Sequence, residues 1–80
     1  MTALACVSPE TFKAILEKCG FCVDEETEYN WTLLNKDALL PVISLPKKGK
    51  LLSVSIMMEI LDLLKIDNGT YFKLLDEVQH

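Results

Sequence analysis

The sequence predicts an α+β domain in which helices cover one face of a three-stranded antiparallel sheet. Two observations lead to this class. Apolar residues recur at helical spacing near both ends of the chain, and three short segments between them show the alternation and β-branched content of strands. Only brief turns separate these segments, which favours an antiparallel meander, because parallel strands need long crossovers. The predicted order is α-β-β-β-α, followed by one more short helix.

The first predicted helix spans residues 9–19. Ser8 can cap its N-terminus, Pro9 suits the first helical position, and Gly20 supplies the stop. The apolar side chains that recur at helical spacing are Phe12, Ile15, Leu16 and Cys19. We therefore expect a helix with one apolar face directed toward a core.

Three strands are expected to follow. Alternating side chains predict strands over residues 21–26 and 29–34, and the polar residues 35–37 predict a turn. The third predicted strand, 40–45, is rich in apolar and β-branched residues. It has Pro41 near its start, where proline is tolerated.

The last part of the sequence predicts two helices. After a loop over residues 46–50, either Ser53 or Ser55 can cap the first of them, whose apolar stripe is Met57, Ile60, Leu61 and Leu64. Residues 66–69 break that helix, and Asp67 can cap the next. The final apolar stripe is Tyr71, Leu74, Leu75 and Val78.

Composition limits the function classes. Eighty residues predict one domain over 1–80, with 1–7 as an N-terminal extension. The twelve acidic residues outnumber the eight basic ones, all lysine, and this excludes a strongly basic histone-like or ribosomal role. No apolar run approaches the roughly 18–20 residues of a membrane helix, and the start lacks the charged region of a signal peptide. We therefore expect a cytoplasmic protein without a membrane partner.

Several short segments follow one another in a particular order and spacing. The first segment is Leu16–Phe21, which ends in Gly-Phe, and the second is Val42–Pro46, which ends in proline. The others are Gly49–Leu52, the pairs 60–61 and 66–67, and Tyr71–Leu75. In this order the chain from Phe12 to Leu75 resembles the HicA family of bacterial toxins. The resemblance implies a double-stranded-RNA-binding-like fold, and an mRNA interferase that a partner antitoxin neutralises.

The active feature of that family is a Gly-Ser-His at the start of the second strand. Here the corresponding tripeptide is Glu28-Tyr29-Asn30, and the only histidine of the chain is His80. RNA cleavage needs a group that titrates near neutrality, which Asn30 is not. We therefore assign no catalytic residue. We expect a degenerate HicA-like protein that acts through protein binding or weak RNA binding, and the alternative is an active interferase.

Two charged segments are candidate contact sites. Lys47, Lys48 and Lys50 can touch RNA phosphates in such a fold, although lysines are also ordinary in a surface loop. The acidic residues Asp24, Glu25, Glu26 and Glu28 replace basic residues that the family often carries. They fit a solvated sheet edge first, a docking patch for a basic partner second, and a cation site last, because the calcium-loop pattern is absent.

Tyr29 and Trp31 extend the candidate partner surface. If they face the open side of the sheet, they form an apolar patch suited to an antitoxin-like protein or to a second copy of the chain. For Trp31, as for Met57, core packing is the preferred prediction, and the patch is the alternative. No cofactor, metal or small-molecule substrate is indicated by the sequence.

Cys19 and Cys22 have the Cys-x-x-Cys spacing of redox and metal sites. A redox pair has its first cysteine at a helix N-terminus, whereas Cys19 is predicted at a C-terminus. A zinc site would need two further ligands, and only Cys6 and His80 are available. We therefore interpret both cysteines as small buried residues beside the helix-to-strand turn.

Overall fold

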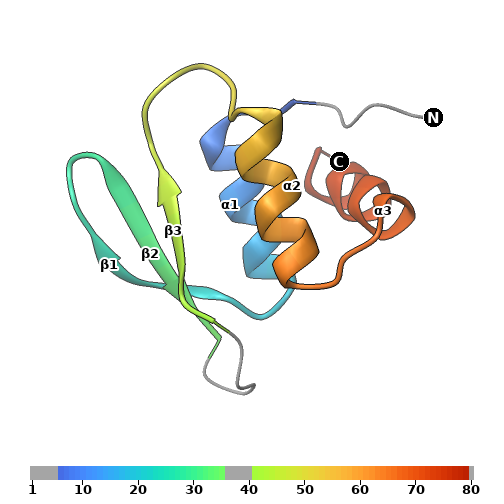
Figure 1. Ribbon diagram of the computed structural model, residues 1–80, viewed down its shortest axis with the longest axis horizontal. Helices are drawn as coiled ribbons and strands as arrows, with labels where there is room; N and C mark the ends of the chain where they lie inside the picture. The colour runs from blue at the N-terminus through green and yellow to red at the C-terminus, as the bar shows by residue number, and fades with distance from the viewer. Residues whose placement is uncertain (1–5, 36–40, 80) are drawn as a thin grey trace.

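The computed structural model describes residues 6–35 and 41–79. Its elements, labelled in Figure 1, are α1 (Pro9–Lys18), β1 (Cys22–Glu26), β2 (Asn30–Leu34), β3 (Ile43–Pro46), α2 (Val54–Leu63) and α3 (Asn68–Gln79). This arrangement confirms the predicted α+β class and the order of a helix, three strands and two helices.

The three strands form one antiparallel sheet with β2 in the middle. Trp31 is the register partner of Glu26 on β1 and of Leu45 on β3. A tight turn joins β1 to β2, where the Thr27 amide donates to the Asn30 carbonyl over 2.8 Å. The pairing is irregular between Val23 and Glu25, where a β-bulge bends the edge strand. The meander expected from the short turns is therefore present.

Three side chains cap the helices. Ser8 Oγ accepts from the Thr11 amide at 3.2 Å, and Ser53 Oγ accepts from the Ile56 amide at 3.2 Å. Asp67 Oδ1 accepts from the Thr70 amide at 2.7 Å at the start of α3. The caps at Ser8 and Asp67 are as predicted, and Ser53 rather than Ser55 caps α2.

Helix α1 ends in a turn that requires glycine. Gly20 has φ +97°, a left-handed conformation that side chains other than glycine adopt at a cost. Asn35 packs against it, and the Asn35 side-chain amide donates to the Cys19 carbonyl at 3.3 Å. A methyl group added at Gly20 would lie 2.9 Å from Asn35 Nδ2. The predicted helix end at Gly20 is therefore confirmed, and glycine is required there both for the positive φ and for the close approach of Asn35.

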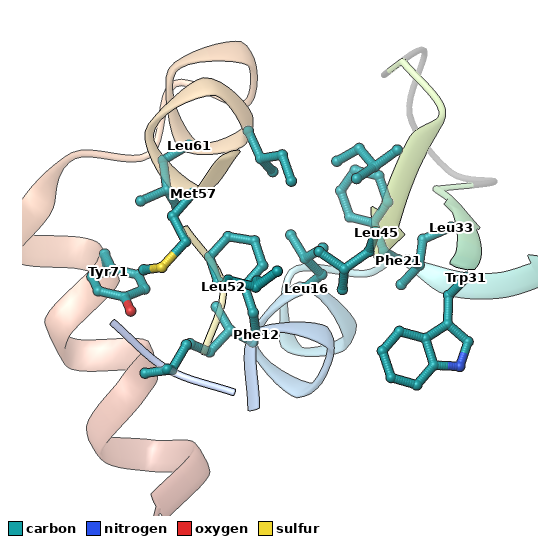
Figure 2. Packing of buried hydrophobic residues seen from close by; sticks show 14 of the residues in the cluster. Phe12, Leu16, Phe21, Trp31, Leu33, Leu45, Leu52, Met57, Leu61 and Tyr71 are labelled. Carbon is teal, nitrogen blue, oxygen red and sulfur yellow. The ribbon is translucent and has the colours of Figure 1, made fainter. Parts of the chain in front are cut away.

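All three helices lie on one side of the sheet, and α3 lies farthest from the strands, against α1 (Figure 1). Phe12 of α1 and Tyr71 of α3 are fully buried, with ring centroids 6.3 Å apart. Figure 2 shows the core between the helices and the inner face of the sheet. The strand residues that project into it are Trp31, Leu33, Ile43 and Leu45.

Several predicted boundaries shift. The second strand begins at Asn30 because Tyr29 lies in the turn, and the third strand is Ile43–Pro46 rather than 40–45. Val7, predicted to lie in an N-terminal extension, is buried, and its carbonyl accepts from the Leu52 amide at 2.8 Å. Residues 36–40, which include most of the predicted turn and the first residue of the predicted third strand, lie outside the described residues. So do residues 1–5 and His80.

Candidate functional site

Lysine and aromatic side chains gather where the β1–β2 turn meets the segment after β3. We call this group the lysine–aromatic cluster, and its members are Lys13, Tyr29, Trp31, Lys47 and Lys48. The pairing of β2 with β3 continues beyond the strand ends, since the Lys47 amide donates to the Tyr29 carbonyl at 2.9 Å. This hydrogen bond fixes the start of the lysine loop against the hairpin turn.

The ammonium groups of the cluster lie over the aromatic rings. Lys13 Nζ is 5.1 Å and Lys47 Nζ is 5.3 Å from the centre of the Trp31 ring. Lys48 Nζ is 4.6 Å from the centre of the Tyr29 ring. Cation–π attraction accounts for these positions, and the lysine stems cover apolar ring surface. The indole of Trp31 is consequently only 8% exposed, although it lies at the margin of the core.

An ion pair connects the cluster to β1. Lys47 Nζ lies 2.6 Å from Glu26 Oε2. The hydrogen bond from Lys47 holds the pKa of the Glu26 carboxyl below its ordinary value, and the charges of Lys47 and then Lys13 add to the effect. Glu26 is the register partner of Trp31, so the side chains of Glu26 and Trp31 leave the same face of the sheet. Glu26 can therefore reach Lys47, which lies over the Trp31 ring.

The other acidic residues predicted as a partner surface remain open to solvent. Asp24, Glu25 and Glu28 are exposed, and Asp24 lies at the irregularity in β1. We call these three residues together with Glu26 the acidic run. Its four carboxylates lie on the strand and turn that border the cluster and its three lysines. Glu26 thus neutralises Lys47 at the cluster, and the exposed carboxylates of Asp24, Glu25 and Glu28 make the surface of β1 and the hairpin turn negative.

Asn30 occupies the position that the resemblance aligns with the catalytic histidine. Alternation along β2 puts it on the face opposite to Trp31 and Lys47, away from the helices. Its backbone N–H donates to Thr27 Oγ1 at 3.0 Å. The structure thus does not bring Lys47 and the Asn30 side chain to one face, and a side-chain amide does not ionise near neutral pH, so it cannot serve as a general acid or base.

The structure corrects the predicted site in two ways. Trp31 belongs to the core, which confirms the preferred prediction for it, so its alternative place in a partner surface on the open side of the sheet is wrong. Lys13 was missed, because it comes 18 residues before Trp31 and no local pattern links the two. Tyr29 does remain 53% exposed, and Lys48 and Lys50 are exposed as expected for a surface loop.

The cysteines differ from the prediction as well. Cys19 is half-buried, and burial raises the pKa of its thiol, but Cys22 is exposed because its side chain leaves the open face of the sheet. The interpretation of both as buried residues is therefore wrong for Cys22. Within residues 6–35 and 41–79, no group of three or more His, Cys, Asp or Glu side chains could hold a metal ion.

Comparison with protein-family models, curated proteins and solved structures found no match to this chain. Among the helices of the described residues, none has the length and apolar character needed to cross a membrane.

Proposed function

We propose that this chain is a non-catalytic, HicA-like cytoplasmic protein that binds a basic partner protein through its acidic run. The observation that supports the proposal most directly is the contrast between the two charged segments. In the lysine loop, Lys47 is engaged by Glu26 and Trp31 and Lys48 lies over the ring of Tyr29, which leaves Lys50, whereas Asp24, Glu25 and Glu28 are all exposed. Complementary charge steers a partner of opposite sign to such a surface.

RNA is the less favourable ligand of this surface. Phosphate binding depends on the number of lysines and arginines that can displace counterions. Lys13 and Lys47 lie against Trp31, Lys47 is paired with Glu26, and the negative charge of the acidic run repels a phosphate backbone. We expect any RNA binding to be weak, with a shallow dependence on salt concentration. Changing Lys47, Lys48 and Lys50 to glutamate should abolish it.

The test is affinity capture with the tagged chain from its own cells, comparing two variants of equal net charge. The first replaces Asp24, Glu25 and Glu28 with lysine, and it leaves Glu26 to hold Lys47. The control replaces exposed helical acids with lysine instead, namely Glu17, Asp62 and Glu77. The wild type and the control should capture the same protein, and the first variant should lose it.

The kinetics of the recovered pair give a second readout. Added salt should slow association more than it changes the dissociation rate, because the acidic run acts mainly on the encounter. Equal capture by both variants would contradict the proposal. Growth arrest on expression of the chain alone, abolished by Asn30→Ala, would contradict the non-catalytic assignment and restore the alternative of an active interferase.

A further inference from the structure

A groove lies between the outer edge of β3 and one flank of α2. Its volume is about 260 Å³, and the described residues that line it are Val42, Ile43, Ser44, Pro46, Ile56, Glu59, Ile60 and Leu63. The two elements run in opposite directions (Figure 1). The lining residues on the strand side extend from Val42 to Pro46, so the groove follows β3. It lies at the sheet edge opposite to β1, and the acidic run takes no part in it.

The β3 edge of the groove has backbone groups available for pairing. The Lys47 amide bonds to Tyr29, and because hydrogen bonding alternates along antiparallel strands, Leu45 also faces β2. The N–H and C=O of Ser44 then point away from β2, to the outer edge. Pro46 has no N–H there, which limits pairing to the part of β3 before it.

The two edges of the sheet are protected to different degrees. The β1 edge has the bulge near Asp24 and the charges of the acidic run, both of which discourage pairing with another strand. β3 carries no charged residue between Ile43 and Pro46. An edge strand without charges is a template for another strand, so β3 is the edge suited to strand addition.

Helix α2 supplies an apolar wall. Ser55, Glu59 and Asp62 are its only polar residues, so apolar side chains extend well beyond the face that packs on the core. On the groove side, Leu63 is 50% exposed and Ile56 is half-buried, and Val42 across the groove is 60% exposed. These side chains would gain burial from a ligand that lies between β3 and α2.

The charge of Glu59 indicates which kind of ligand fits the groove. Glu59 is the only charged residue among the described residues that line the groove. A second copy of the chain carries a formal net charge of −4, so like charges disfavour its approach to the groove and to Glu59. A lysine or arginine on the occupant would pair with Glu59 instead.

We propose that this groove binds an extended segment of a partner protein, which adds to β3 as a fourth strand. Its backbone pairs with Ser44, its apolar side chains lie on Ile56 and Leu63, and one basic side chain meets Glu59. The residues of the segment that face α2 are thus apolar except for the one basic residue, because every second side chain of a strand faces the same wall.

The test uses two synthetic peptides in which valine and threonine alternate, one with lysine and one with glutamate at the centre. Amide chemical shifts of the full chain report binding. The lysine peptide should shift the Ser44 amide and bind about threefold or more tightly than the glutamate peptide, as expected for one exposed ion pair. N-methylation of the lysine peptide on its pairing edge should abolish binding. Glu59→Lys should invert the charge preference, and Leu63→Lys should remove binding of both peptides.

Two control variants separate the groove from overall charge and hydrophobicity. Asp62→Lys changes the net charge as Glu59→Lys does, and Met58→Lys removes an apolar residue that is 56% exposed on another flank of α2. Neither residue lines the groove, so both variants should bind like the wild type. Equal affinity for the two peptides, shifts confined to β1, or no shift at millimolar peptide would overturn the proposal. A dimer in sedimentation that Leu63→Lys dissociates would overturn it in favour of a second copy.

Discussion

Glu26 and Lys47 form an ion pair that spans the middle strand of the sheet. Glu26 lies on β1 and Lys47 follows β3, and their side chains meet over β2 at 2.6 Å, beside the ring of Trp31. The pair therefore connects the three strands at one end by side chains, in addition to the backbone hydrogen bonds.

The ion pair predicts a dependence of stability on acid. The pKa of Glu26 is lowered in the folded state from an ordinary value of 4.5, chiefly by the hydrogen bond from Lys47. The contribution of the ionised Glu26 to folding stability is therefore complete above pH 4.5, and it is lost as the pH falls through the lowered pKa of the folded state. Lys47→Met keeps the stem on Trp31 but removes the charge. A carbon-detected NMR titration should show the Glu26 pKa rising in this variant, and an unchanged pKa would contradict the pairing.

The raised pKa of Tyr71 predicts that the protein also loses stability at alkaline pH. Burial, with a smaller contribution from Cys6, raises the pKa of Tyr71 from 10.0 to about 12. Because the folded pKa is the higher one, the stabilisation is complete below pH 10 and is lost as the pH rises toward 12. Absorbance of the phenolate should report Tyr71 ionising together with unfolding measured by circular dichroism. Tyr71→Phe should remove this component. In a Tyr29→Phe background, which leaves Tyr71 as the only tyrosine of the chain, phenolate formation at pH 10 without unfolding would show that Tyr71 is not buried.

The cysteines should react in a defined order. Cys22 and Cys6 are exposed, whereas Cys19 is half-buried with a raised pKa, so its reactive thiolate is scarcer. With limiting iodoacetamide at neutral pH, mass spectrometry should find Cys22 and Cys6 modified well before Cys19. In denaturant the three rates should converge. Faster modification of Cys19 than of Cys22 in the native protein would contradict the structure.

Replacement by alanine should affect stability differently at Gly20, in the turn after α1, and at Gly69, in α3. Gly20→Ala places a methyl group 2.9 Å from Asn35 at a positive φ, and we expect a loss of stability of about 1–2 kcal/mol or more. Gly69→Ala is the matched control. Its methyl group would meet only Asp67, at an ordinary 3.6 Å, within helix α3, and should cost nothing or stabilise by about 0.4–1 kcal/mol. Denaturant unfolding measures both, and equal effects would contradict the role given to Gly20.

The purified chain should not cleave mRNA above background at any pH from 5 to 9. Asn30 is an amide on the open face of the sheet and supplies no proton-transferring group. Asn30→Ala should behave identically in a gel assay with labelled transcript. Cleavage by the wild type that this variant lacks would restore an active interferase.

Much of the fold was predictable because its signals are local. Ser8 and Asp67 cap the helices that follow them, and Gly20 ends the first helix, since each acts on backbone groups within a few residues. Periodicity likewise separated strands from helices, and most errors were at their ends. The boundary of β3 was misjudged because pairing with β2, rather than composition, decides where the strand begins.

The site depended on contacts between residues far apart in the sequence. Alternation along β2 shows that Asn30 and Trp31 face opposite sides, but it does not show which side the helices cover. Packing decides that, because one face must lose its contact with water. Only then do Trp31, Lys13 and Lys47 meet, and only then are Cys22 and Cys19 placed in different environments. The sequence alone thus determined the elements and their order, and the tertiary structure decided which side chains share a surface, because burial is a property of the assembled layers.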